Sequence, residues 1–125
     1  MSGGGPTVLV VEDHSGVLAL AVAVLEHAGW QVLQAGSAAE AQTVLEQHGV
    51  DVVVSDVSLP GGTGAVPTYA ADARGRTPGV VYMSGDTARA RLRNQAGTEH
   101  ARFLSKPFSP AALVDAVGAV RPQPD

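Results

Sequence analysis

The sequence predicts an α/β fold in which a parallel β-sheet carries helices on both faces. Short apolar segments alternate five times with longer segments of helical character, and this alternation is typical of repeated βα units. Several of the short segments are apolar at almost every position, as expected of strands that are covered on both faces. The 125 residues fit one domain, which we expect over residues 6–121, with flexible tails at residues 1–5 and 122–125.

The first two βα units carry the clearest signals. The apolar run Val8–Val11 predicts a buried strand, and Ser15–His27 predicts a helix that its first serine caps. Residues Trp30–Ala35 alternate well enough for a second strand. The segment Ser37-Ala38-Ala39-Glu40 has the spacing of a capping box and predicts a helix that continues through Gln47.

The other three units follow the same pattern, although their first helix is weak. Its proline, Pro67, is tolerable only in the first turn of a helix. The final helix begins with a serine cap and stops before two prolines. The predicted strands of these units are Asp51–Ser55, Val80–Met83 and Arg102–Ser105, and the predicted helices are Ala65–Ala73, Thr87–Ala96 and Ser109–Val120.

Composition excludes several classes of protein. The net charge is −4 and the arginines are spread along the chain, which argues against a nucleic-acid-binding surface. The chain has no cysteine, so it has neither a disulfide framework nor a thiolate metal site. No apolar run approaches the roughly 20 residues of a membrane span, and the first residues do not form a signal peptide. We therefore expect a cytoplasmic domain that binds no membrane.

Polar side chains follow four of the five predicted strands. Glu12 and Asp13 follow the first strand, Asp56 the third, Ser84 the fourth, and Lys106, the only lysine, the fifth. The carboxyl ends of parallel strands line one crevice, so these side chains are expected to converge. Three neighbouring carboxylates require a cation, and hard oxygen ligands suit Mg²⁺. With a lysine beside it, such a site is suited to receive a phosphoryl group on a carboxylate.

Taken in order, these residues resemble the receiver domain of two-component response regulators. The resemblance covers about Thr7–Val120 and also includes Gly64, Phe103 and Pro107. It implies a flavodoxin- and CheY-like three-layer sandwich, with five strands in the order 2-1-3-4-5. Three segments are similar to the C-terminal receivers of hybrid histidine kinases, so we expect either a module of such a kinase or a stand-alone regulator. These segments are Leu59-Pro60-Gly61-Gly62, Val81-Tyr82-Met83-Ser84-Gly85 and Lys106-Pro107-Phe108-Ser109-Pro110.

The resemblance implies an acceptor and a metal site. Asp56 would be the phosphoacceptor. Mg²⁺ would be held by Asp13, by Asp56 and by the backbone carbonyl of Ser58, while Glu12 would act through water. A purely structural role remains open for the acidic pair, because Glu12 and Asp13 could instead cap the helix that follows. Their neighbour His14 is interpreted as a surface residue, since Mg²⁺ does not favour imidazole.

The resemblance also implies switch residues. Lys106 would bind the phosphoryl oxygens, Ser84 would move to hydrogen-bond the phosphate, and Phe103 would be the aromatic switch. Phe103 stands where a tyrosine is often found, and we expect its ring to lie inward even without phosphate. Ser58 and Asp86 occupy positions that tune phosphate lifetime in this family.

The partner implied is a histidine kinase or a histidine phosphotransfer protein. The face formed by Thr87–Val120 is a candidate surface for a partner or a homodimer. We expect a signalling module, not an enzyme. One alternative is a receiver-like docking module that is never phosphorylated. Another is a phosphatase with an aspartyl nucleophile, which is disfavoured because Ser58 stands where such an enzyme places its general acid.

Overall fold

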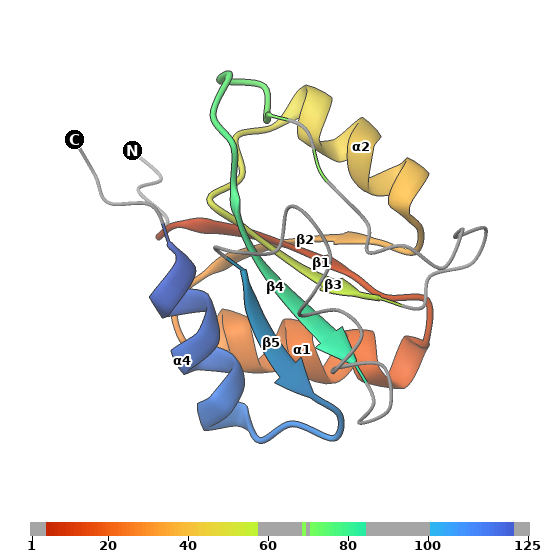
Figure 1. The fold of residues 1–125 in the computed structure, drawn as a ribbon, viewed down its shortest axis with the longest axis vertical. Coiled ribbons are helices and arrows are strands. Elements are labelled where there is room, and N and C mark those ends of the chain that lie inside the picture. Colours follow the sequence, from red (N-terminus) through yellow and green to blue (C-terminus); the bar gives the residue numbers. More distant parts are fainter. Residues whose placement is uncertain (1–4, 58–68, 70, 85–100, 122–125) are drawn as a thin grey trace.

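Five parallel strands form a single sheet in the computed structural model, which describes residues 5–57, 69, 71–84 and 101–121 (Figure 1). Three helices are described beside it. The strands are β1 (Thr7–Val11), β2 (Gln31–Ala35), β3 (Val52–Asp56), β4 (Gly79–Ser84) and β5 (Arg102–Ser105), and the helices are α1 (Ser15–His27), α2 (Ala38–Gln47) and α4 (Pro110–Val120).

The strand order is β2-β1-β3-β4-β5, which confirms the predicted doubly wound topology. In register, Val11 of β1 lies beside Ser55 of β3, and Ser84 of β4 lies beside Ser105 of β5. The ends of β1 and β3 are therefore level, as are the ends of β4 and β5. The residues that leave these strands thus meet at one edge of the sheet.

The sheet is the middle of three layers. Helices α1 and α4 cover one face and α2 covers the other (Figure 1). Alternate strand residues supply the two cores, since successive side chains of a strand point to opposite faces. The core beneath α1 and α4 includes Val10, Val54 and Met83, and the core beneath α2 includes Leu9 and Val53.

The helix caps agree with the sequence in two of three cases. Ser37 Oγ accepts a hydrogen bond from Glu40 N at 3.1 Å, and Ser109 Oγ accepts one from Ala112 N at 3.1 Å. The expected cap of α1 was wrong by one residue, because His14 is the N-cap and its Nδ1 accepts from Val17 N at 3.3 Å. The backbone of His14 is extended, whereas Ser15 is already helical. At the other end Gly29 adopts φ 98°, which glycine tolerates best.

Two predicted elements need correction. The third strand was predicted to end at Ser55, but β3 extends to Asp56. The predicted helix Ala65–Ala73 is not helical at its described residues, which are Tyr69 and Ala71–Ala73. Near its end the Asp72 carboxylate accepts from the backbone N–H groups of Arg74 and Arg76, and such local bonds compete with a helix. The rest of that helix, and all of the predicted helix Thr87–Ala96, lie outside the described residues.

A polar clasp ties the amino end of β3 to the chain before β4. The Asp72 side chain is fully buried and accepts from Val50 N at 2.8 Å and from Arg74 Nη2 at 2.7 Å. Arg74 also pairs with Asp51, whose carboxylate accepts from Thr7 N at 2.8 Å. Burial raises the pKa of Asp72, but these hydrogen bonds lower it more strongly, to about 2. The clasp therefore stabilises the edge of the sheet opposite the predicted site.

Within the described part of the chain, no helix is both long and apolar enough to cross a membrane.

Candidate functional site

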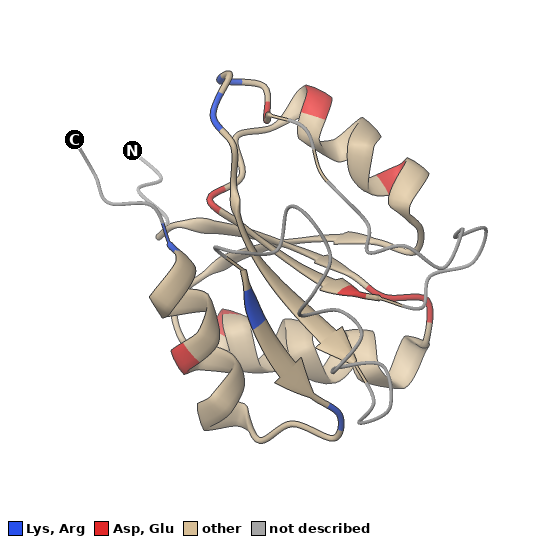
Figure 2. Ribbon diagram, in the orientation of Figure 1, with Lys and Arg blue, Asp and Glu red and all other residues tan. Residues whose placement is uncertain are grey.

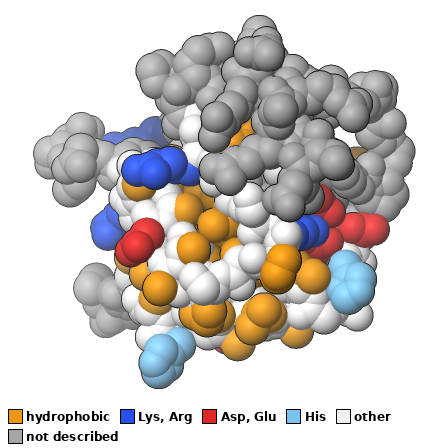
Figure 3. Space-filling model, turned by 60° about the horizontal axis from the view of Figure 1, so that its bottom comes forward, with side chains coloured by type: hydrophobic (Ala, Val, Ile, Leu, Met, Phe, Trp, Pro, Cys, Tyr) orange, Lys and Arg blue, Asp and Glu red, His pale blue; other side chains and the backbone are white. Residues whose placement is uncertain are grey.

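The carboxyl edge of the sheet gathers the acidic residues that the sequence placed there. Glu12 and Asp13 leave β1, and Asp56 is the last residue of the neighbouring strand β3. Acidic positions accordingly cluster where β1 and β3 end, and a basic position lies just beyond β5 (Figure 2). The space-filling view shows one basic side chain in contact with this acidic surface (Figure 3). Residues far apart in the sequence thus form one charged site.

Lys106 is the cation of this site. Its Nζ lies 2.7 Å from Glu12 Oε1 and 3.4 Å from Asp56 Oδ2. The Glu12 side chain is 1% exposed and that of Asp56 is 9% exposed, whereas the lysine keeps 27% of its side chain in solvent. The other Glu12 oxygen, Oε2, accepts from His14 N at 3.1 Å. Glu12 is thus held by an ion pair and a backbone hydrogen bond, and this geometry does not cap α1.

The surroundings of Glu12 and Lys106 shift both of their pKa values upward. Burial raises the pKa of Glu12; the hydrogen bonds from Lys106 and His14 oppose this, and the charge of Asp56 adds to it. Burial lowers the pKa of Lys106, but the hydrogen bond to Glu12 and the charges of Asp56 and Glu12 outweigh it. Lys106 therefore keeps its proton beside the buried carboxylate of Glu12.

The carboxylates of Glu12, Asp13 and Asp56 fit a divalent cation. One oxygen from each lies within 4.8 Å of the others, and Asp13 is exposed whereas Glu12 and Asp56 are buried. Hard oxygen donors with one side open to solvent match the preference of Mg²⁺, which keeps several of its waters. The donor set therefore fits the magnesium site that the sequence predicts. Ser58, whose carbonyl was expected to complete it, lies outside the described residues.

Ser84 places a free hydroxyl at the end of β4. The residue is 1% exposed, and its Oγ is the one buried side-chain polar atom without a hydrogen-bond partner among the described residues. The backbone carbonyl of Ser84 accepts from Lys106 N at 2.9 Å, so the serine and the lysine leave their strands side by side. The peptide bond between Lys106 and Pro107 is cis. An unpaired buried hydroxyl is costly, and a phosphoryl oxygen would give it an acceptor.

Phe103 packs on a second aromatic ring. It lies on β5 opposite Tyr82 of β4, with ring centroids 5.7 Å apart and planes at 28°. The ring of Phe103 is half-buried, and that of Tyr82 is buried. The aromatic side chain expected to switch is therefore in contact with its neighbouring strand.

The structure also shows a contact that the motifs did not indicate. Tyr69 donates or accepts a 2.6 Å hydrogen bond with Ser55 Oγ, directly behind Asp56. No spacing rule relates these two positions, so the sequence offered no signal for it. Two predicted site residues, Ser58 and Asp86, lie outside the described residues, as does the part of the predicted partner face before residue 101.

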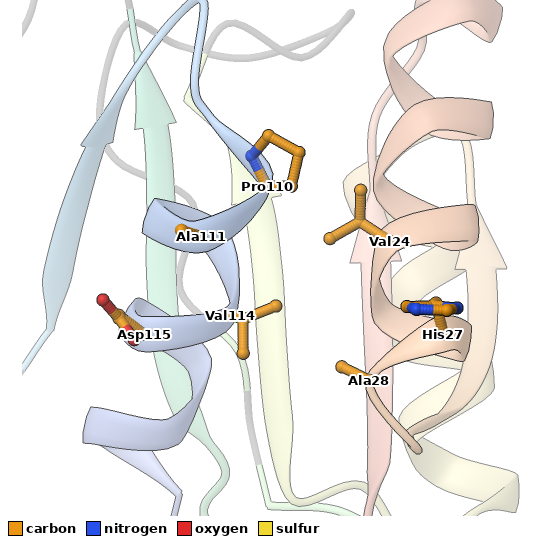
Figure 4. Close-up of a pocket in the computed structure, with 7 residues that line it drawn as sticks. All are labelled: Val24, His27, Ala28, Pro110, Ala111, Val114 and Asp115. Carbon is orange, nitrogen blue, oxygen red and sulfur yellow. The ribbon is translucent and has the colours of Figure 1, made fainter.

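A separate apolar groove lies between α1 and α4 (Figure 4). Its volume is about 360 Å³, with His27 and Asp115 among residues that are otherwise Val24, Ala28, Pro110, Ala111 and Val114. It contains none of the clustered carboxylates and has no lysine. The groove therefore lacks the groups that phosphoryl chemistry needs, and the acidic site remains the candidate reaction centre.

A sheet of this topology, with three carboxylates and a lysine at its carboxyl edge, defines the receiver class of two-component signalling proteins. Comparison with known families agrees, since the model of the response regulator receiver domain matches residues 8–118. The chain belongs to the response regulator receiver domain family.

Curated relatives place the chain within larger proteins. It is 37% identical over 118 residues to the sensor kinase CckA of Brucella abortus, covering 91% of this chain and 12% of that protein. It is 32% identical over 120 residues to the phosphate regulon transcriptional regulatory protein PhoB of Klebsiella pneumoniae, covering 90% of this chain and 50% of that protein. The chain thus spans half or less of these relatives.

Solved structures share the fold. The chemotaxis response regulator CheY4 of Vibrio cholerae matches with a TM-score of 0.75 and 23% identity, over 92% of this chain and 98% of that one. The receiver domain of the hybrid histidine kinase CckA matches with a TM-score of 0.65 and 28% identity, over 90% and 95%. Both similarities confirm the expected CheY-like architecture.

Proposed function

We propose that this receiver domain accepts a phosphoryl group on Asp56 from a phosphohistidine, in the presence of Mg²⁺, and thereby regulates a partner protein. The observation that carries the proposal is the site itself. Three carboxylates have oxygens within 4.8 Å of one another, and Lys106 Nζ lies 3.4 Å from Asp56 Oδ2. Phosphoryl transfer depends mainly on positioning and charge neutralisation, and this arrangement supplies both.

The proposed reaction balances without any further reagent. A carboxylate oxygen of Asp56 bonds to phosphorus as the bond from phosphorus to the histidine nitrogen breaks, and the departing imidazole takes up a proton. Lys106 and the Ser84 hydroxyl then hydrogen-bond the phosphoryl oxygens. A bound Mg²⁺, held by Asp13 and Asp56, would neutralise charge on the transferred group. Hydrolysis later returns the carboxylate and inorganic phosphate.

The proposed output is a change in surface, not turnover of a substrate. An aspartyl phosphate introduces negative charge beside Lys106, so the lysine is drawn from Glu12 towards the new group. Ser84 ends β4 and Phe103 lies on β5, so both are placed to respond to that shift. The partner that we infer is a histidine kinase or a histidine phosphotransfer protein, which fits the resemblance to the CckA receiver.

Intact-mass spectrometry after incubation with acetyl phosphate tests this function. The wild type should gain one phosphoryl mass with Mg²⁺ and none with EDTA, and Asp56→Asn should gain none. Asp115→Asn is the matched control, because Asp115 is an exposed aspartate on α4 and should leave the gain unchanged. A folded wild type that gains no mass in either condition would overturn the proposal and favour a docking module without phosphorylation.

A further inference from the structure

A buried hydrogen-bond chain lies behind the predicted phosphoacceptor. Tyr69 OH and Ser55 Oγ are 2.6 Å apart, and Ser55 Oγ donates to the backbone carbonyl of Asp56 at 3.1 Å. Ser55 is fully buried. The ring of Tyr69 packs against the core beneath α2, which contains Leu9 and Val53. The tyrosine is therefore anchored on the core and reaches the acceptor backbone through one serine.

Proton counting fixes the direction of this chain. A serine hydroxyl has a single proton, and that of Ser55 goes to the Asp56 carbonyl. Tyr69 must therefore donate to Ser55, which requires a protonated phenol. Burial raises the pKa of Tyr69, the hydrogen bond to Ser55 opposes this, and the charge of Asp56 raises it further, so the phenol keeps its proton at neutral pH.

The hydrogen bonds of Tyr69 and Ser55 hold the carbonyl end of one peptide unit, and a bond to β4 holds its N–H end. The carbonyl of the Asp56–Val57 peptide accepts from Ser55, and the N–H of the same peptide, on Val57, donates to Met83 O at 3.1 Å. Peptide units are planar and rigid, so two such bonds fix the orientation of this one. This peptide unit begins at the Cα atom of Asp56, which carries the acceptor side chain.

We propose that Tyr69 is a positioning residue for phosphorylation, acting through Ser55 to fix the Asp56–Val57 peptide unit. This role rests on the proposed function. A misplacement of about 1 Å can cost an enzyme about a hundredfold in rate, so a fixed peptide unit favours attack by Asp56. The tyrosine hydroxyl bonds to Ser55, so it would act on Asp56 through the backbone.

Single-residue variants test the role by kinetics. Tyr69→Phe retains the packed ring and removes the hydroxyl, and Ser55→Ala breaks the chain at its centre. We expect each to lower the maximal rate of Mg²⁺-dependent phosphorylation from acetyl phosphate by about three- to tenfold, with the half-saturating donor concentration unchanged. The double variant should be no slower than Ser55→Ala, because both changes interrupt one chain.

Ser37→Ala provides the matched control. It also removes a hydroxyl that bonds to backbone, but at the cap of α2, where Ser37 Oγ accepts from Glu40 N. A purely structural role would lower stability alike in all variants and leave the rate of the folded protein unchanged. Hydrogen exchange at the Val57 amide should quicken in Tyr69→Phe and not in Ser37→Ala.

The possible outcomes separate the two proposals. If the wild type is phosphorylated and Tyr69→Phe matches Ser37→Ala in maximal rate, the positioning role is wrong and the proposed function stands. The role is equally excluded if the effects of Tyr69→Phe and Ser55→Ala multiply. An inert wild type would overturn the function and the role together. Tyr69→Phe alone decides the matter should Ser55→Ala not fold.

Discussion

The ammonium of Lys106 lies 2.7 Å from Glu12 Oε1, across a sequence separation of 94 residues. The resemblance to receiver domains implies that this lysine binds phosphoryl oxygens and that Glu12 acts through water. In the structure the lysine is paired most closely with Glu12, and Asp56 is its second partner at 3.4 Å. The ammonium of Lys106, which would bind the phosphoryl oxygens, is therefore already paired with carboxylates before phosphorylation.

This ion pair predicts a stability change in Lys106→Met. Removing the ammonium leaves Glu12, 1% exposed, without its cation, so the free energy of unfolding should fall by about 1–3 kcal/mol at pH 7. The deficit should shrink as the pH falls, since the raised pKa of Glu12 lets it become neutral above its ordinary value of 4.5. Urea denaturation at several pH values measures both effects.

Two further variants sharpen that test. Arg102→Met removes an exposed cation from β5, the strand that precedes Lys106, and should change stability by no more than about 0.5 kcal/mol. Lys106→Arg keeps the charge and should retain more stability, yet its planar fork should impair phosphorylation. A Lys106→Met protein as stable as Arg102→Met at pH 7 would contradict the importance of the pair.

The clasp at the opposite edge predicts acid sensitivity. The folded-state pKa of Asp72 is about 2, below the ordinary 3.8, so its ionised form stabilises the fold above pH 3.8. That stabilisation, up to about 2 kcal/mol, is lost as the pH falls from 3.8 through 2. Asp72→Asn should remove this part of the pH dependence, whereas Asp115→Asn should preserve it. Thermal melts between pH 2 and pH 7 compare the variants.

The acidic cluster predicts a specific loss of metal binding. Asp13→Ala should weaken Mg²⁺ binding by about tenfold or more, because it removes one of the three carboxylates that cluster among the described residues. Isothermal titration calorimetry measures the dissociation constant, with Asp115→Ala as the control. Equal affinities for Asp13→Ala and the wild type would mean that the metal binds elsewhere.

The stacked rings predict a preformed aromatic contact. If Phe103 lies inward before phosphorylation, NMR contacts between its ring and that of Tyr82 should be present both with and without a phosphoryl mimic such as beryllofluoride. Phe103→Ala should lower the free energy of unfolding by about 1–3 kcal/mol, since the ring is half-buried. Ring contacts that occur only with the mimic would show that Phe103 moves inward on activation.

Much of the fold could be predicted because its signals are local. Apolar runs such as Val8–Val11 and the cap at Ser37 depend on neighbours in the sequence, and topology then follows from the rules for parallel sheets. The helix predicted at Ala65–Ala73 failed at its end because the Asp72 carboxylate bonds to nearby backbone N–H groups, and its distant partner Val50 favours that geometry. No local pattern shows such a partner.

The site, like the fold, was predicted where its signals are local in the sequence and missed where they are not. Residue types at strand ends predicted that Glu12, Asp56 and Lys106 would meet, because the register of parallel strands is well defined. The pairing within the cluster depends on side-chain positions, which a one-dimensional pattern does not contain. Tyr69 was missed for that reason, since its hydrogen bond to Ser55 depends on how the segment between β3 and β4 folds back against the core.

The pairing of Glu12 with Lys106 has a consequence for synthesis of the protein. Glu12 leaves the ribosome long before Lys106, and translation at about 5–20 residues per second separates them by several seconds. During that interval a nascent chain has β1 and β3 available, yet the buried carboxylate of Glu12 lacks the ammonium of Lys106. The ion pair that holds Glu12 in the folded domain can therefore form only after β5 and the lysine that follows it have emerged.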